Sequence, residues 1–348
     1  MKVLLIAPSI NPITYKGLGR YCKEIYNGLR KLIDADLIIK TVEMDKALST
    51  YTEIPLRILK AGKHDIVHAL TPEMGVYTPL LCQNAVTTFH DLIPILESGH
   101  MRFKFPHLIN MHTRFTWWLS GRAKRIIANS TQTKQELTQV LGIRTEKIGV
   151  IPLGVHQRFK PAENPRIHRP PTIGFFGNFT YRKGADAAIE TFRQVREKVD
   201  VQLTLAGGRI QTPYQRHFNL NKMTEGLKGV KTIEHVPEKD LPKLYQSFDV
   251  MLCPSSYEGF GLPILEAQKC GVPVLTMDNA RIPLEVKKET VVCKSVKDMA
   301  NRTIDLLMND HLRREVSERG RRYASQFTWE NTIRKTLEVY NRILLDPN

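Results

Sequence analysis

The chain has 348 residues, of which 42% are hydrophobic, and it carries a formal net charge of +16. This size and composition predict a large buried core and two domains, and the lack of any apolar run of about 18 residues excludes an ordinary membrane-spanning helix. The charge predicts attraction to polyanions such as anionic lipid, nucleic acid or phosphorylated substrates. Five cysteines with no CxxC pair argue against a disulfide framework or zinc site and favour a reducing cytoplasm.

Short apolar runs alternate with amphipathic stretches along the first half of the chain. A helical pattern near 18–33 follows the first run, and the cap-like Asn129-Ser130-Thr131 opens a helix after the fifth. This rhythm predicts a parallel sheet covered by helices. The runs that we predict as buried strands are 3–7, 37–42, 65–70, 85–90, 125–129 and 147–154.

A polar, proline-bearing stretch at 156–171 reads as a linker, and the same rhythm then restarts. A helix is predicted at about 184–198, and consecutive helices are predicted over 295–345. The pattern therefore predicts an α/β protein with two doubly wound, Rossmann-like domains facing an interdomain cleft, with ligands beyond the carboxyl ends of the strands. The strands predicted in the second half are 172–177, 201–208, 230–236, 249–254 and 272–277.

The loop after the strand at 249–254 carries the strongest chemical signal, YEGFGLPILE (257–266). Gly259 and Gly261 let a ligand approach the main chain, and the helix that Pro263 opens offers free N–H groups to an anion. Glu258 precedes this helix and Glu266 lies about one turn into it. Their spacing suits a ligand with hydroxyls at two distant points, although the helix dipole alone favours Glu266 and Glu258 is also compatible with plain surface.

The segment PSSYEGFGLPILEAQKCGVPVL resembles the donor-site signature of glycosyltransferase family 4, whose members are retaining enzymes with the GT-B fold. Other segments also look like parts of that family, so the resemblance extends nearly end to end; they are 89–94, 125–137, 148–155, 181–186 and 327–340. It is closest to the mannosyltransferase-like branch that assembles surface glycans. The resemblance implies an acceptor domain at 1–160, a nucleotide-sugar domain at 161–325, and a C-terminal helix at 326–348 that crosses back to the first domain.

The resemblance also implies roles for the residues of this loop. Glu258 contacts hydroxyls of the transferred sugar, and Glu266 accepts hydrogen bonds from the ribose of the nucleotide. Main-chain N–H groups of Gly259, Phe260 and Gly261, continuing into Leu262, hold sugar and phosphate oxygens. The base is read largely by main chain near 235–240, where Val236 is the residue that we assign to the donor.

Two further strand-end segments match the family. Arg182 and Lys183 follow the strand at 172–177 and are expected to neutralise the diphosphate, although such a pair on its own is usually a solvated surface. His90 ends the strand at 85–90 and is expected to contact the transferred sugar, although a histidine there is more often structural. Asp91 is expected to position the loop, and Asn178, where many relatives carry arginine, is given no role.

Two glycines near the N-terminus, Gly17 and Gly19, are interpreted as part of a loop after the first strand, and the resemblance implies that this loop approaches the donor phosphate and the acceptor. A dinucleotide-binding fingerprint is rejected because Cys22 stands where its third glycine belongs. The stretch Asp34–Asp36 imitates a metal-binding DxD but is interpreted as a turn on the wrong side of a parallel sheet. Since Arg182 and Lys183 supply the positive charge, no metal or other cofactor is predicted.

From residue 98 to residue 135 the chain holds seven Lys or Arg, several aromatic residues and no Asp or Glu. A basic helix with Trp suits an anionic membrane or a lipid-linked acceptor. A helix with core aromatics and solvated charges, and a nucleic-acid surface, remain alternatives. The residues that we assign to the acceptor or membrane are Arg102, Lys104, Arg114, Trp117, Trp118 and Arg122.

The sequence as a whole therefore predicts a metal-independent hexosyltransferase that uses a nucleotide-diphosphate sugar of the GDP-mannose or UDP-glucose type. Its acceptor is expected to be a glycan or lipid-linked molecule at the cytoplasmic, inner face of the membrane, and no nucleic-acid partner is expected. Two alternatives stay open: a sugar-nucleotide epimerase of the same architecture, and a non-enzymatic polyanion- or membrane-binding protein.

Overall fold

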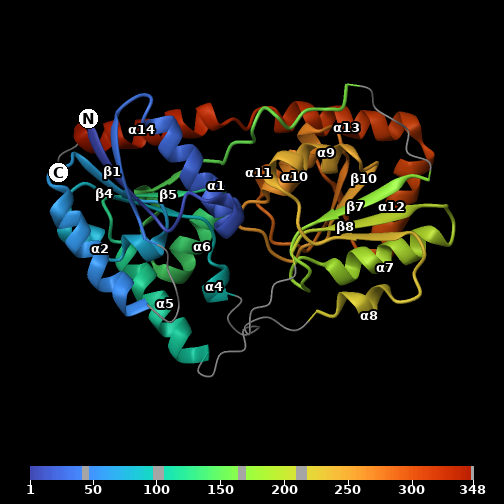
Figure 1. The fold of residues 1–348 in the computed structure, drawn as a ribbon, viewed down its shortest axis with the longest axis horizontal. Coiled ribbons are helices and arrows are strands. Elements are labelled where there is room, and N and C mark those ends of the chain that lie inside the picture. The colour runs from blue at the N-terminus through green and yellow to red at the C-terminus, as the bar shows by residue number, and fades with distance from the viewer. Residues whose placement is uncertain (41–46, 97–105, 164–169, 209–217, 346–348) are drawn as a thin grey trace. The chain divides into compact units, whose positions relative to one another are not determined.

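The computed structural model describes residues 1–40, 47–96, 106–163, 170–208 and 218–345 (Figure 1). The described residues fall into two compact units. Unit 1 lies within Met1–Ser98, Phe105–Gly154 and Thr328–Asn348, and unit 2 lies within Val155–Phe327. The change of unit thus comes at 154/155 and 327/328, close to the predicted 160/161 and 325/326. Val155 belongs to unit 2 because its N–H donates to Phe327 and its carbonyl accepts from Lys269.

Unit 1 contains a six-stranded parallel sheet in the order β2-β1-β3-β4-β5-β6. The strands are β1 (Lys2–Ala7), β2 (Asp34–Ile39), β3 (Ile66–Ala69), β4 (Ala85–Phe89), β5 (Arg125–Ala128) and β6 (Ile148–Val150). The longer helices are α1 (Pro12–Leu29), α2 (Ala47–Ala61), α5 (Pro106–Ser120), α6 (Thr131–Leu141) and α14 (Trp329–Leu345). Short helical turns are η2 (Pro72–Gly75), α3 (Thr78–Leu81), α4 (Ile93–Leu96) and η4 (Thr145–Lys147).

Helices cover both faces of this sheet, with α1 and α14 on one side and α2 and α5 on the other (Figure 1). The central strands β1, β3 and β4 are almost wholly buried because both faces of the sheet are covered, whereas the edge strand β2 is partly exposed. Phe89 of β4, Trp117 of α5 and Leu137 of α6 share one cluster of the core. The last helix, α14, packs on α1 and is part of unit 1, although it is separated from the rest of that unit along the chain.

Unit 2 contains a second six-stranded parallel sheet in the order β12-β11-β10-β7-β8-β9. Its strands are β7 (Thr172–Phe176), β8 (Gln202–Ala206), β9 (Val230–Ile233), β10 (Val250–Cys253), β11 (Val274–Met277) and β12 (Val291–Cys293). The helices are α7 (Ala185–Arg196), α8 (Leu220–Thr224), α9 (Leu241–Gln246), α10 (Leu262–Lys269), α11 (Leu284–Lys287), α12 (Val296–Met308) and α13 (Asp310–Ala324), and η5 (Glu238–Asp240) is a short turn.

In unit 2, α7, α8 and α12 lie on one face of the sheet, and α9, α10 and α13 lie on the other (Figure 1). In both sheets the strand order reverses beside the first strand of the unit, β1 or β7. The prediction of two doubly wound α/β domains is confirmed. Each strand predicted from an apolar run is present, and the sequence analysis missed only the short strand β12 among those described.

Two local predictions were wrong. Gly17 and Gly19 lie inside helix α1 and not in a loop, because the helix begins at Pro12, a residue that favours the first helical position. Asp34–Asp36 form the first residues of β2 and not a turn, since they pair in register with Lys2–Leu4 of β1. Asp36 accepts a hydrogen bond from His64, and its carboxylate lies 3.5 Å from the Lys2 ammonium. These two contacts, and not a metal ion, are the partners of the carboxylate in the structure.

Candidate functional site

The loop between β7 and α7 carries the predicted cations and is tied to the loop after β10. The Arg182 guanidinium donates to the carbonyl of Tyr257 at 2.8 Å, and the Arg182 carbonyl accepts from the N–H of Ser256 at 2.8 Å. Gly184 precedes α7 with φ +72°, and a Cβ there would lie 2.3 Å from the Pro254 carbonyl oxygen. Only glycine therefore lets the two loops approach this closely.

Lys183 and Glu258 form an ion pair at the carboxyl ends of these neighbouring strands. The Lys183 Nζ lies 2.6 Å from both carboxylate oxygens of Glu258, and both side chains are largely buried. The Ser255 hydroxyl donates to Glu258 Oε1 at 2.7 Å, and the Glu258 N–H donates to the carbonyl of Arg281. The carboxylate is therefore held by two side chains and by its own backbone.

Electrostatics keep this carboxylate ionised despite its burial. Burial raises the pKa of Glu258, but the charge and hydrogen bonds of Lys183, the Ser255 hydroxyl and the charge of Arg182 together bring that pKa below its ordinary value. Burial raises the pKa of the neighbouring Cys253 thiol to about 12, and the Glu258 charge adds to that rise. Cys253 is thus a neutral thiol beside the charged pair and a poor nucleophile.

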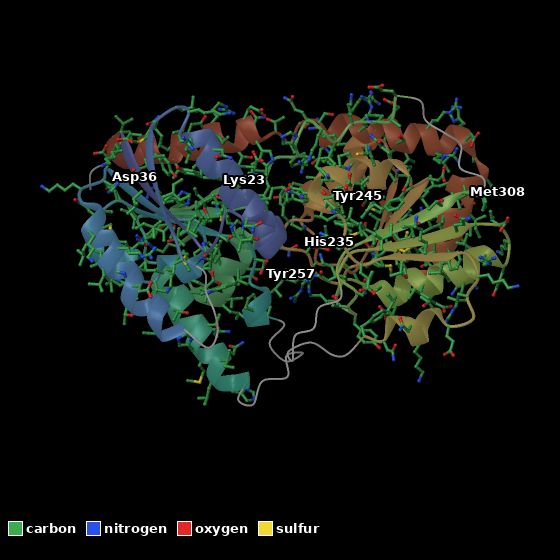
Figure 2. All side chains as sticks on the ribbon, in the orientation of Figure 1. Lys23, Asp36, His235, Tyr245, Tyr257 and Met308 are labelled. Atoms are coloured by element: carbon green, nitrogen blue, oxygen red, sulfur yellow. The ribbon has the colours of Figure 1, made fainter. Side chains whose placement is uncertain are left out.

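Glu266 lies on α10, just beyond its first turn, and is buried. Its Oε2 accepts a hydrogen bond of 2.9 Å from the hydroxyl of Tyr245, which α9 contributes. Gly261 ends the preceding loop with φ +99° and serves as the N-cap of α10, and a Cβ there would lie 3.8 Å from that of Glu258. Figure 2 labels Tyr245, which bonds to Glu266, and Tyr257, which precedes Glu258 and whose carbonyl accepts from Arg182.

The other predicted donor residues of unit 2 lie along the same segment or at the same edge of the sheet. Phe260 is buried and packs edge-to-face on Phe327, so its side chain belongs to the core and only its main chain is available to a ligand. Gly259 is half-buried, whereas Leu262 is buried. Val236 follows the carboxyl end of β9 and is half-buried.

In unit 1, His90 directly follows β4 and is held on three sides. Its Nε2 lies 3.0 Å from the carbonyl of Leu70, so Nε2 carries the proton and Nδ1 of the neutral ring keeps its lone pair. Tyr21 packs edge-on against the ring at 4.5 Å, and Asn129 donates to the His90 carbonyl at 2.7 Å. Burial lowers the pKa of His90 to about 4.

The residue after His90 also behaves as expected for a loop-positioning group. Asp91 Oδ1 accepts from the N–H of Ile93 at 2.9 Å, where the short helix α4 begins. Asn178, to which we gave no role, follows β7 between Gly177 and Phe179 and is half-buried.

Sequence reasoning missed a polar network beneath His90. His68 of β3 lies 2.6 Å from the hydroxyl of Tyr340 on α14 and 2.8 Å from the hydroxyl of Thr88 on β4. Tyr21 of α1 is 3.0 Å from the same Thr88 hydroxyl. All four side chains are buried, and burial lowers the pKa of His68 to about 3. The only signal in the sequence was a histidine within an apolar strand, which is common in ordinary cores.

The predicted acceptor or membrane residues divide between core and surface. Trp117 is a core residue that packs edge-to-face on Phe89, whereas Trp118 is exposed and stacks on Phe115. The prediction that both tryptophans lie at a membrane was therefore wrong for Trp117, because consecutive helical residues point about 100° apart. Arg114 and Arg122 are exposed, and Arg102 and Lys104 lie outside the described residues.

Among the described residues, no group of three or more His, Cys, Asp or Glu is placed to hold a metal ion. No described helix is both long and apolar enough to cross a bilayer. The groups that do converge in unit 2 are cations, a buried carboxylate and a glycine-rich backbone before a helix. Cations and backbone N–H groups are the usual partners of phosphate oxygens, and carboxylates accept hydrogen bonds from hydroxyls.

Known proteins resemble this chain in sequence and in fold. The chain is 26% identical over 281 residues to O-antigen chain mannosyltransferase B of Escherichia coli, and the aligned region covers 76% of this chain and 72% of that protein. It is 28% identical over 236 residues to D-inositol 3-phosphate glycosyltransferase of Paenarthrobacter aurescens (strain TC1), and this aligned region covers 63% of this chain and 57% of that protein.

Two solved structures show the same fold at low identity. Sucrose-phosphate synthase from Thermosynechococcus elongatus aligns with a TM-score of 0.81 and 16% identity, over 99% of this chain and 100% of that one. Anabaena Alr3699/HepE in complex with UDP-glucose aligns with a TM-score of 0.77 and 19% identity, over 98% and 100%. These likenesses support the GT-B architecture.

Family models agree with this assignment. The model for glycosyl transferases group 1 matches residues 156–323, which include Arg182, Lys183, Glu258 and Glu266. The model for glycosyltransferase family 4 matches residues 46–159, which include His90. The two matches overlap at residues 156–159 and together span most of the chain, so the protein belongs to the glycosyltransferases that these two models describe.

Proposed function

We propose that this protein is a retaining, metal-independent hexosyltransferase. It transfers a sugar from a nucleotide diphosphate of the GDP-mannose or UDP-glucose type to a glycan or lipid-linked acceptor at the cytoplasmic face of the membrane. The observation that carries the proposal is the Lys183–Glu258 pair, with Ser255 on the same carboxylate, at the carboxyl ends of β7 and β10. Strand ends beside a reversal of strand order are where open α/β sheets bind ligands.

The pair supplies two functions to one donor. When a diphosphate binds, Lys183 turns from Glu258 to the phosphate oxygens, and Arg182 adds its planar guanidinium. Glu258 then accepts hydrogen bonds from hydroxyls of the sugar. As the bond to the sugar breaks, negative charge grows on the leaving diphosphate, and fixed cations stabilise that charge without a divalent ion.

The remaining donor contacts follow from α10 and its neighbours. Glu266, oriented by Tyr245, accepts hydrogen bonds from the ribose hydroxyls. The backbone that opens α10 presents N–H groups to sugar and phosphate oxygens. His90 offers its Nδ1 lone pair to a sugar hydroxyl, since Nε2–H is already bound to Leu70. The Cys253 thiol is neutral, and Glu258 is assigned to the sugar hydroxyls and not to the reacting carbon. We therefore propose attack by the acceptor on the face that the diphosphate leaves.

Relatives support both donor types. One is named as a mannosyltransferase, and a protein of the same fold was solved with UDP-glucose.

A surface on α5 supports the membrane location. Its exposed residues Leu108, Met111, Phe115 and Trp118 recur at helical spacing, and Arg114 and Arg122 flank them. We call these four residues the α5 stripe; a basic helix with such a stripe suits an anionic membrane interface.

Thermal-shift screening of UDP- and GDP-sugars, followed by transfer to membrane lipid extracts, tests this function. A ligand at about 100 times its dissociation constant adds about 2.7 kcal/mol of stability, which is easily seen. A glycolipid product that keeps the anomeric configuration of the donor is the expected result. Formation of a new sugar isomer without acceptor would indicate an epimerase, and the absence of any nucleotide-sugar affinity would indicate a non-enzymatic polyanion-binding protein.

A further inference from the structure

Unit 1 contains a cavity of about 290 Å³ that the proposed chemistry does not use. Its walls combine one aromatic ring, two aliphatic side chains and three cations. The cavity could hold far more than a single water molecule, whose share of liquid volume is about 30 Å³. The side chains that line it are Trp118, Arg122, Leu141, Ile143, Arg144 and Lys147.

The cavity lies at the edge of the unit 1 sheet opposite to His90. It forms where α5 and α6 end, at Ser120 and Leu141, and where β5 and β6 begin, at Arg125 and Ile148. These are the amino-terminal ends of parallel strands, whereas His90 follows the carboxyl end of β4. Within unit 1, the cavity is therefore separate from His90, the residue that the proposed function assigns to the sugar.

Positive charge is concentrated around this cavity and is poorly compensated. Lys147 donates only weakly, at 3.3 Å, to the carbonyl of Ala123. Burial lowers the pKa of Lys147, and the charges of Arg144, Arg122 and Arg125 lower it further against the opposite effect of Glu146. Glu146 does lie 3.3 Å from Arg144, but both side chains are mostly exposed, so that pair stabilises little. A bound anion would relieve the repulsion among these cations.

The α5 stripe leads directly to the cavity. Leu108, Met111, Phe115 and Trp118 are between 41% and 65% exposed, and Trp118 belongs to both the stripe and the cavity wall. The Arg122 guanidinium lies 5.2 Å from the centre of the Trp118 ring. An apolar stripe that ends at a tryptophan and a cluster of cations matches the layering of a bilayer, whose acyl region adjoins phosphate headgroups.

We propose that this cavity binds the phosphate of an anionic phospholipid, while the α5 stripe lies in the bilayer interface. Arg144 and Lys147 hold the phosphate oxygens, and Trp118 packs beside the glycerol and the upper acyl chain. The proposal rests on the proposed function only in placing the protein at a membrane. It goes beyond it by naming a lipid site outside the reaction site.

Vesicle sedimentation of the full chain tests this site. The probes are vesicles of phosphatidylcholine alone and vesicles of equimolar phosphatidylcholine and phosphatidylglycerol. The test variant is Arg144→Gln/Lys147→Gln, and the matched control is Lys23→Gln/Lys31→Gln, which removes the same charge from exposed positions on and just after α1 (Figure 2 labels Lys23). We expect the cavity variant to lose at least tenfold in partitioning to anionic vesicles and the control to lose about twofold or less.

Several results would overturn the proposal. Equal losses in the two double variants would mean attraction by diffuse charge, and equal binding to neutral vesicles would mean no phosphate recognition. If inorganic phosphate raises the melting temperature but the chain does not bind anionic vesicles, the cavity is a site for a free anion and not for a lipid. Because the Arg144 side chain is 72% exposed, the single Arg144→Gln variant folds and gives the same comparison should the double variant unfold.

Nucleotide-sugar binding separates this inference from the proposed function. The cavity variant should bind the donor sugar as well as the unmodified chain does, because the cavity and the donor residues lie in different units. Loss of vesicle binding with unchanged donor binding supports the lipid site. Absence of donor binding in every form would contradict the proposed function and leave the lipid site to be judged on vesicle binding alone.

Discussion

At the scale of single residues, the ion pair between Lys183 and Glu258 links stability to function. Glu258 is 7% exposed, and Lys183 is its only cationic partner within hydrogen-bonding distance among the described residues. The same contact that stabilises the protein without donor must be exchanged for contacts to the donor during the proposed reaction. Removing one partner should therefore destabilise the protein more than removing both, whereas either change should abolish transfer.

We expect Lys183→Ala to lower the free energy of unfolding by roughly 2 to 4 kcal/mol, because it leaves a buried carboxylate without its cation. The double variant Lys183→Ala/Glu258→Ala should recover most of that loss while remaining inactive. Urea unfolding and transfer assays on the two single variants and the double variant complete the cycle. Recovery of transfer in the double variant, or near-normal transfer in Lys183→Ala, would contradict the assigned roles.

Ser255 is predicted to position Glu258, since its hydroxyl is 2.7 Å from the carboxylate and is itself buried. Ser255→Ala should cost about 1 kcal/mol of stability and lower the transfer rate by about tenfold. The hydroxyl also lowers the pKa of Glu258. Its loss should therefore move the acidic limb of the pH–rate profile to higher pH, a shift that a purely structural role would not produce. Ser255→Thr should restore the limb.

At the scale of elements, most strands could be predicted because each is a short apolar run, and central strands such as β1, β3, β4 and β10 are buried on both faces. Element ends were less predictable: α1 begins at Pro12, six residues before its predicted start, since the pattern around Gly17 and Gly19 looks like a loop. The pair Arg182 and Lys183 could be found from its place after a strand. Ser255, Tyr245 and His68 could not, because their roles depend on contacts between segments far apart along the chain.

Helix α14 is predicted to depend on its contact with the core of unit 1. Tyr340 on this helix is buried and bonds to His68. Tyr340→Phe removes that bond and leaves a buried polar group unpaired, so it should cost about 1 to 3 kcal/mol. Asn341→Ala, at the exposed neighbouring position, should change stability by less than about 0.5 kcal/mol. Equal effects of the two variants in urea unfolding would mean that this bond does not hold α14.

At the scale of the whole molecule, pH should affect stability through the buried histidines of unit 1. His68 is wholly buried and its pKa is about 3 in the folded protein, against 6.5 for the ordinary side chain. Its stabilising contribution is complete above pH 6.5 and is lost as pH falls from there toward 3, because the unfolded chain then binds a proton that the folded chain refuses. His90, with a folded pKa of about 4, acts in the same direction.

We expect His68 alone to contribute a loss of about 2 kcal/mol in the free energy of unfolding between pH 7 and pH 5. Glu73 acts in the opposite sense over part of this range, since burial raises its pKa. The informative quantity is therefore the difference in pH dependence between the unmodified chain and His68→Gln, measured by urea unfolding at both pH values. The variant starts less stable, because it loses bonds to Tyr340 and Thr88, but its stability should fall less on acidification. Parallel pH curves for the two proteins would show that His68 is not held neutral by burial.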